Sequence, residues 1–90
     1  MQHNNKIIRI VYLAFPDKIH GATVETDYEF LIGINSGITS ITKRFALGHE
    51  LAHVCLNHLS SGRPLQDAER EANRNAWRFY RAFRDSRLPG

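Results

Sequence analysis

The segment from Ile41 to Leu59 constrains the fold more than any other part of the chain, because its apolar residues recur on two sides of a helix. At about 100° per residue, the two sides are separate stripes. One stripe contains Ile41, Phe45, Gly48, Ala52, Cys55, Leu56 and Leu59, and the other contains Leu47, Leu51 and Val54. A helix that is apolar on two sides packs against two different elements, so the segment predicts a central helix that ends near Leu59.

The arc outside these stripes carries an H-E-x-x-H motif at residues 49–53. Positions four apart lie one turn apart on the same face of a helix, so His49 and His53 can offer imidazole nitrogens to one zinc ion. Glu50 is then placed to take a proton from a zinc-bound water. The alternative is a solvated or core-edge histidine pair, and a third ligand is needed to distinguish the two.

The third ligand is sought in a second helical segment, from Leu65 to about Arg84. Glu69 borders the apolar face of this segment, whereas Glu71 lies on its other flank and is expected to face solvent. Asn73 lies one turn after Glu69 and could hydrogen-bond a ligand from behind. A surface carboxylate paired with arginine is the alternative interpretation of Glu69, and Glu71 stays open as the ligand.

Two segments, residues 45–53 and residues 69–73, together resemble the ImmA/IrrE family of zinc metallopeptidases. The strand-like Ile32-Gly33-Ile34-Asn35 is similar to the strand that precedes the active helix in that family, and the resemblance covers roughly residues 12–76. It implies a gluzincin-like site in a minimal zincin-like domain. In this site His49, His53 and Glu69 hold one zinc ion, and Glu50 is the general base.

The resemblance also implies a biological setting. Relatives cleave DNA-binding repressors, so a protein or peptide substrate of this regulatory kind is expected. The chain departs from the family pattern after Asn73, where Asn75 stands at a position that is usually phenylalanine and Trp77 follows. Many relatives carry a further helical part or a helix-turn-helix domain, so we expect a shortened version of the family.

The whole chain is expected to form one domain over residues 1–90, with residues 1–6 frayed. Its 90 residues are 42% hydrophobic and 23% charged, which is typical of a globular domain and not of a disordered tail. The apolar stretch Ile7 to Phe15 is too short to span a membrane and lacks a signal-peptide cleavage site. The expected location is therefore the cytoplasm, without a membrane partner.

Three strand patterns precede the first helix, over Ile7–Phe15, His20–Glu25 and Glu29–Asn35. Brief turns join them, which predicts a three-stranded antiparallel sheet. The fold class is then α+β, with two helices packed on one face of the sheet. We expect Glu29–Asn35 to be an edge strand that pairs with an extended substrate; the alternative is an edge that only faces water.

Three further residues are weighed for the site. His20 and Tyr80 could contact the substrate and stabilise a developing oxyanion. His58 lies about 140° from His53 on the helical wheel. It is therefore expected at the surface or at the helix end.

Basic residues gather on the second helix, within about 120° of arc. They are Arg70, Arg74, Arg78, Arg81 and Arg84. A solvated helix face is one interpretation, and direct nucleic-acid binding is not expected. Two rivals to the peptidase remain: a metal-stabilised regulatory binding module that contacts a partner through these arginines, and a metal-free nucleic-acid-binding domain.

Overall fold

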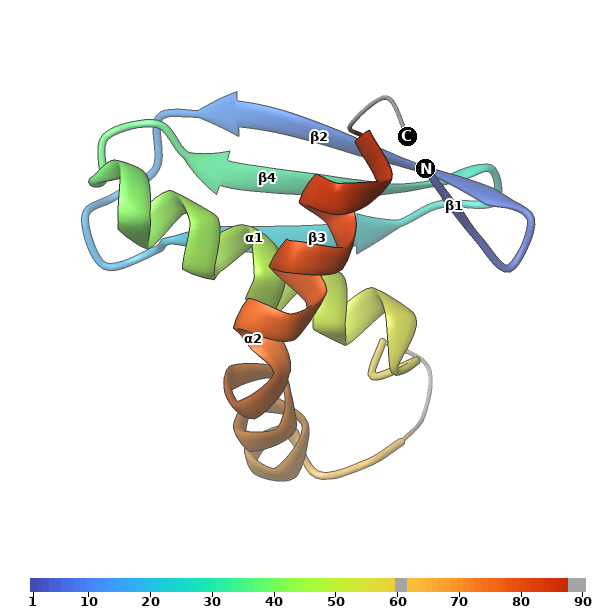
Figure 1. The fold of residues 1–90 in the computed structure, drawn as a ribbon. Coiled ribbons are helices and arrows are strands. Elements are labelled where there is room, and N and C mark those ends of the chain that lie inside the picture. Colours follow the sequence, from blue (N-terminus) through green and yellow to red (C-terminus); the bar gives the residue numbers. More distant parts are fainter. Residues whose placement is uncertain (60–61, 88–90) are drawn as a thin grey trace.

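The computed structural model describes residues 1–59 and 62–87 and shows an α+β fold (Figure 1). Four strands form one sheet, and two helices lie on the same side of it. The elements are β1 (Gln2–His3), β2 (Lys6–Leu13), β3 (Gly21–Glu25), β4 (Glu29–Asn35), α1 (Ser40–Cys55) and α2 (Leu65–Arg87). The predicted fold class is confirmed, whereas the predicted sheet is not. Neither of the helices in the described ranges has the length and apolarity needed to cross a membrane.

The sheet is mixed, with the strand order β1-β2-β4-β3. β4 runs parallel to β2 and antiparallel to β3. The predicted three-stranded antiparallel meander is wrong, because β4 inserts between β2 and β3. To skip one strand the chain must cross roughly 10 Å, which residues 14–20 span easily.

The central position of β4 explains its composition and corrects the predicted substrate edge. Phe30, Ile32 and Ile34 are all buried, because they alternate on the face of β4 that α1 covers. Glu29–Asn35 is therefore not an edge strand. The edge strand next to the H-E-x-x-H motif of α1 is β3, which contacts both β4 and α1.

The N-terminal residues, expected to be frayed, form a short hairpin. β1 pairs antiparallel with the beginning of β2. Asn4 and Asn5 connect the two strands with φ values of 52° and 64°. Asparagine tolerates the left-handed region better than most residues, and two successive positive φ values make a tight hairpin turn. The ring of His3 then reaches the side chain of Asn57, with 3.2 Å between Nε2 and Oδ1.

The C-terminal end of α1 also differs from the prediction. The helix ends at Cys55 and not at Leu59, because Asn57 adopts a left-handed φ of 59°. The backbone N–H of His58 then donates to the carbonyl of His53 at 3.0 Å. This pattern is a Schellman helix end, in which the chain folds back over the last turn.

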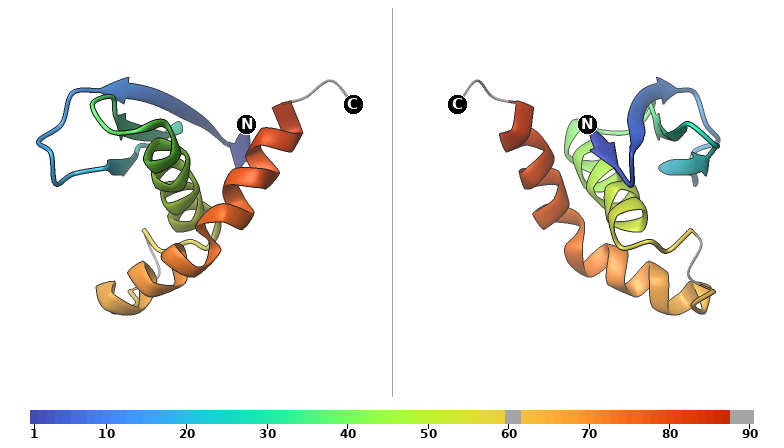
Figure 2. Two further views of the ribbon diagram at one scale, coloured as in Figure 1. Left: turned by 60° about the vertical axis from the view of Figure 1, so that its left-hand side comes forward. Right: turned by 90° about the vertical axis from the view of Figure 1, so that its right-hand side faces the viewer.

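α1 lies between the sheet and α2, so its two apolar stripes face different layers (Figure 2). The helices cross closely: a Cβ atom built at Gly48 would lie 1.9 Å from the carbonyl oxygen of Ala76. A glycine is therefore required at this crossing. The buried core joins sheet and helices through Ile8, Phe30, Ile32, Ile34, Ala46, Leu47, Leu51, Val54 and Phe83.

Candidate metal centre

The two histidines of the motif lie one turn apart on α1, on its polar arc. Their Nε2 atoms are 3.0 Å apart. Only 15% of the His49 side chain and 10% of the His53 side chain are exposed. The helix therefore presents two imidazole nitrogens at one point at the border of the packed interior.

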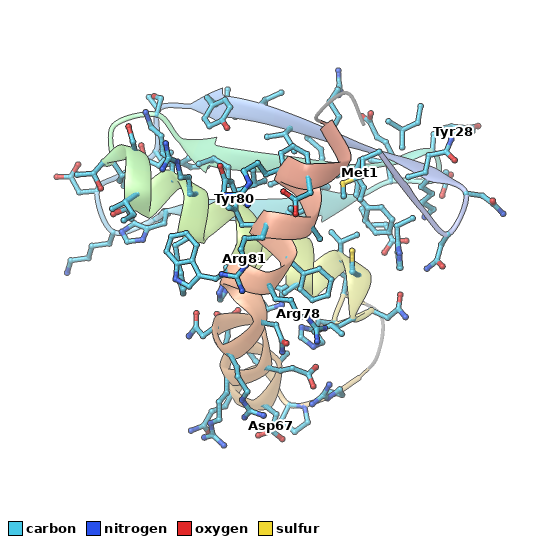
Figure 3. All side chains as sticks on the ribbon, in the orientation of Figure 1. Met1, Tyr28, Asp67, Arg78, Tyr80 and Arg81 are labelled. Carbon is cyan, nitrogen blue, oxygen red and sulfur yellow. The ribbon has the colours of Figure 1, made fainter. Side chains whose placement is uncertain are left out.

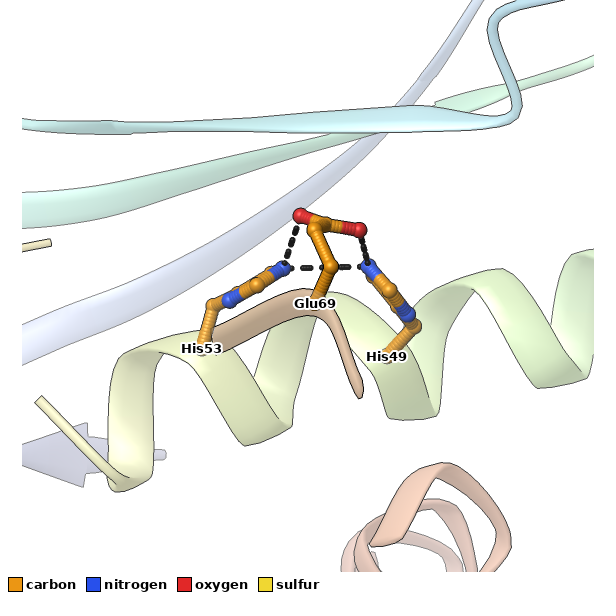
Figure 4. A group of neighbouring side chains, drawn as sticks. All are labelled: His49, His53 and Glu69. Atoms are coloured by element: carbon orange, nitrogen blue, oxygen red, sulfur yellow. Dashed lines mark hydrogen bonds and ion pairs between the residues drawn. The ribbon is translucent and has the colours of Figure 1, made fainter. Parts of the chain in front are cut away.

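Glu69 reaches this point from the first turns of α2 (Figure 4). Its Oε2 lies 3.0 Å from Nε2 of His49, and its Oε1 lies 2.8 Å from Nε2 of His53. The close helix crossing thus brings together three side chains that are separated by up to 20 positions in the sequence. All three ligand atoms lie within 4.8 Å of one another.

This group fits a catalytic zinc ion. Two imidazole nitrogens and one carboxylate oxygen form one of the usual three-residue ligand sets, which leaves the fourth position for water. Ligand atoms about 2.1 Å from a tetrahedral ion lie roughly 3.4 Å apart. The separations of 2.8–3.0 Å are near this value, so small side-chain movements would accommodate the ion.

Glu50 lies beside these atoms and is itself buried, with 8% of the residue exposed. The hydroxyl of Thr23 in β3 donates to Oε1 of Glu50 at 2.8 Å. The other carboxylate oxygen, Oε2, lies 3.9 Å from Nε2 of His49. Thr23 was not predicted as a site residue, because a single threonine in a short strand gives no signal until the neighbour of that strand is known.

His49 is held from behind by α2. Its Nδ1 lies 2.7 Å from Oδ1 of Asn73. An amide oxygen only accepts hydrogen bonds, so Nδ1 of His49 donates. The other ring nitrogen, Nε2, is then unprotonated, and it lies next to Nε2 of His53 and the carboxylate of Glu69.

His53 has a different partner, His58, which was expected at the surface or at the helix end. His58 does follow the end of α1, but only 2% of its side chain is exposed. Its Nδ1 lies 2.9 Å from Nδ1 of His53, and its Nε2 lies 2.6 Å from Oε1 of Glu71. The helical wheel failed because Asn57 ends the helical geometry before His58. Glu71, expected to face solvent, keeps 31% of its side chain exposed. It also bonds to His58 and, at 2.7 Å, to Nη1 of Arg63.

The comparison with known families agrees with this geometry. The model of the IrrE N-terminal-like domain (Peptidase_M78) matches residues 4–84. The chain belongs to this family. The predicted resemblance to ImmA/IrrE proteins is thereby confirmed, and the family is one of metal-dependent peptidases. No curated protein and no solved structure matches the chain.

Burial and neighbouring groups in this IrrE-like site lower two pKa values, that of the His53 imidazole and that of the Glu71 carboxyl. Burial lowers the pKa of His53 below its usual value, and the nearby His49 lowers this pKa further. The hydrogen bonds with His58 and then with Arg63 lower the pKa of the Glu71 carboxyl. Neutral imidazole is the form of histidine that binds a metal ion, so the environment of His53 suits a ligand.

Two cavities flank the motif of the IrrE-like domain, and Gly21 and Glu50 line both of them. The first, of about 310 Å³, also contains His53, Arg63, Leu65 and Glu69. The second, of about 350 Å³, also contains His20, His49, Phe45 and Asn73. The candidate metal-ligand group is therefore accessible from two sides along β3.

His20 and Tyr80, both considered for the site, lie in different places. His20 lines the cavity of about 350 Å³ together with His49 and Glu50. Tyr80 leaves α2 on the side of α1, where its Cβ would lie 3.1 Å from a Cβ built at Gly48 (Figure 3). It lines a separate cavity of about 430 Å³, which contains neither motif histidine.

Proposed function

We propose that this chain is a zinc metalloendopeptidase that hydrolyses a peptide bond in a regulatory protein. The observation that carries this proposal is the convergence of His49, His53 and Glu69 within 4.8 Å, beside the buried carboxylate of Glu50. The nitrogen and oxygen donors favour zinc with an open position. Membership of a peptidase family supports hydrolysis as the reaction.

Glu50 is the proposed general base. Bound zinc would polarise the scissile carbonyl and lower the pKa of a water molecule. Thr23 engages Oε1 of Glu50, which leaves Oε2 on the side of the ligand atoms, 3.9 Å from Nε2 of His49. Oε2 can therefore take a proton from the attacking water and deliver it to the leaving amine.

The substrate is proposed to bind along the outer edge of β3. An extended peptide can pair with an exposed strand edge through main-chain hydrogen bonds. β3 is at the edge of the sheet, and its Gly21 and Thr23 lie next to Glu50. The two cavities on either side of Gly21 would then receive substrate side chains from both sides of the scissile bond.

A DNA-binding repressor is the substrate that the resemblance to ImmA/IrrE proteins suggests. Restricted cleavage of one such protein suits a small domain with shallow cavities better than broad digestion. The cavities of about 310 and 350 Å³ are large enough for single side chains but not for a folded segment. An extended or locally unfolded stretch of the repressor would therefore be cut.

The test compares wild type with Glu50→Gln, and uses Asp85→Asn as a matched change at an exposed carboxylate. Each zinc-loaded protein is incubated with a proteome-derived peptide library, and new termini are identified by mass spectrometry. We expect cleavage at a restricted set of sites by wild type and Asp85→Asn. Glu50→Gln should keep its zinc and cleave roughly 100-fold more slowly or worse. Cleavage by Glu50→Gln at the wild-type rate would show that Glu50 is not the base.

A second function is favoured by five arginines of α2, each of which is exposed: Arg70, Arg74, Arg78, Arg81 and Arg84. Arg78 and Arg81 extend from the outer side of the helix (Figure 3). In this alternative the chain is a metal-stabilised regulatory module that binds an acidic partner through this face. It predicts a function that survives Glu50→Gln but is lost when Arg74 and Arg78 are replaced together by glutamate.

A further inference from the structure

His58 lies next to Nδ1 of His53, the ring nitrogen that is not part of the ligand group. The helical wheel did not predict this position. His58 follows the end of α1, yet its side chain is almost fully enclosed, with 2% exposed. It contacts His53 twice: its backbone N–H donates to the carbonyl of His53 at 3.0 Å, and the two Nδ1 atoms lie 2.9 Å apart. Its other ring nitrogen contacts Glu71 at 2.6 Å.

We infer that His58 and Glu71 form a hydrogen-bonded relay that fixes the tautomer and the ring orientation of His53 for metal binding. This inference rests on the proposed function, because it assumes that His53 holds a metal ion. His58 and Glu71 are positioning residues in this account. Neither is a proposed ligand of the ion, and His58 also lines the cavity of about 310 Å³.

The direction of the relay follows from what each group can donate. The ionised carboxylate of Glu71 only accepts, so Nε2 of His58 carries the proton that it donates to Oε1. A neutral His58 then has an unprotonated Nδ1, which accepts from Nδ1–H of His53. The lone pair of His53 is left on Nε2, the atom that lies 2.8 Å from Glu69 and 3.0 Å from His49.

The opposite tautomer of His53 would place a proton on Nε2, where the metal has to bind. The relay therefore selects the tautomer that can be a ligand. It also selects one ring orientation, because the imidazole of His53 is bonded at Nδ1 while its Nε2 points to Glu69.

The same short stretch of α2 supplies both a proposed metal ligand and the last acceptor of the relay. Glu69 contributes a ligand atom, and Glu71, two positions later, contributes the acceptor that ends the relay. Arg63 holds the Glu71 carboxylate through Nη1 at 2.7 Å. Docking of α2 on α1 therefore assembles the ligand and the support of its neighbour in one step.

The experiment measures zinc affinity by competition with a chromophoric chelator, and the visible absorption spectrum after Co²⁺ is loaded in place of zinc. The proteins are wild type, His58→Ala, His58→Asn, Glu71→Ala and, as a matched control on α2, Asp67→Ala. Asp67 is an exposed carboxylate one turn before Glu71 (Figure 3). Far-UV circular dichroism with chelator present shows whether each metal-free protein is folded.

The relay predicts that His58→Ala binds zinc about 10- to 100-fold more weakly than wild type, with a changed Co²⁺ spectrum. Glu71→Ala should give a smaller loss in the same direction. His58→Asn should recover most of the affinity, because its amide oxygen offers His53 the kind of acceptor that Asn73 offers His49. Asp67→Ala should match wild type.

Wild-type affinity and an unchanged Co²⁺ spectrum in both His58→Ala and Glu71→Ala would overturn the relay while the proposed metal site stands. A wild type that takes up no zinc would overturn both. If His58→Ala does not fold, Glu71→Ala and His58→Asn decide the question. Glu71→Ala at wild-type affinity, or a zinc affinity of His58→Asn about 100-fold or more below that of wild type, would then count against the relay.

Discussion

His49 and His53 come from the same motif and offer the same atom, yet the two imidazoles are supported in different ways. His49 donates to one amide oxygen, at 2.7 Å, on the exposed residue Asn73. His53 is bonded to a buried histidine, His58, and through it to a carboxylate. Water can replace the exposed amide of Asn73 as the hydrogen-bond acceptor for His49, but it has little access to the enclosed ring of His58. The two ligands should therefore respond differently when their partners are removed.

The largest expected effect comes from removing either imidazole, because the whole zinc site is then expected to be lost. His49→Ala and His53→Ala each delete one of the three proposed ligands, so both should lose stoichiometric zinc binding. Elemental analysis after gel filtration in metal-free buffer measures the zinc content per chain. One zinc per chain in either variant, held as tightly as in wild type, would show that the missing imidazole is not a ligand.

The next largest effect comes from disturbing the close crossing of α1 and α2. The support of both His49 and His53 depends on this crossing, because it involves residues of α2. In Gly48→Ala the new methyl group would lie 1.9 Å from the carbonyl oxygen of Ala76, so α2 has to move away from α1. We expect a loss of about 2–3 kcal/mol or more in the free energy of unfolding. Thermal unfolding followed by circular dichroism should show a midpoint lower by roughly 10 °C or more.

Gly37→Ala is the control for the helix crossing. A Cβ at Gly37 would meet Oδ1 of Asn35 at 3.4 Å, which is an ordinary contact. Its unfolding midpoint should therefore stay close to that of wild type. A Gly48→Ala protein as stable as Gly37→Ala would mean that the helices do not cross as closely as described.

A smaller effect separates the two imidazoles directly. Asn73→Ala removes the partner of His49, and His58→Ala removes the partner of His53. We expect a loss of zinc affinity near tenfold for Asn73→Ala and a larger one, towards 100-fold, for His58→Ala. Chelator competition on both proteins under one set of conditions measures the ratio. Equal losses would show that burial of the partner is irrelevant.

The smallest effect concerns pH and the metal-free protein. The pKa of His53 in the folded state lies below its ordinary value of 6.5, chiefly because the residue is buried. Below that value the unfolded chain binds a proton that the folded chain does not, so stability falls as the pH falls. Above it, His53 contributes no pH dependence.

Urea unfolding with chelator present, at about pH 7.5 and pH 5.5, tests this sign, because the two conditions lie on either side of the usual histidine pKa. Wild type should be less stable at the lower pH, and His53→Gln should show a smaller difference between the two conditions. A larger pH dependence in His53→Gln would contradict the assignment. The Glu71 carboxyl does not interfere in this range, because its pKa lies below an ordinary value of 4.5.

Much of the ligand group was accessible from sequence because it lies within regular helix. The wheel put His49 and His53 on one border of α1 and Glu69 on the matching border of α2, and the structure brings their ligand atoms within 4.8 Å. It failed at His58, since Asn57 takes a left-handed φ that residue type alone does not dictate. Glu71 is partly exposed, with 31% of its side chain accessible, but its bond to His58 could not be foreseen without the position of His58.

The sheet was predicted less well, because strand order is set by contacts far apart in the sequence. Residues 14–20 look like one brief connection whether β3 pairs with β2 or with β4. The apolar run Phe30-Leu31-Ile32-Gly33-Ile34 was the available signal, since a continuous apolar run is more typical of a central strand with a parallel neighbour than of an edge strand. Reading that signal would have placed β4 in the centre and the free edge at β3.

The central claim, a three-ligand zinc site, is tested most directly by zinc content per chain in wild type, Glu69→Ala and Asp67→Ala. Elemental analysis on all three proteins, prepared in parallel, decides it. We expect about one zinc per chain in wild type and Asp67→Ala, because a site with three protein ligands holds one ion, and a loss of that zinc in Glu69→Ala. No zinc in wild type after zinc is added, or an undiminished content in Glu69→Ala, would contradict the account.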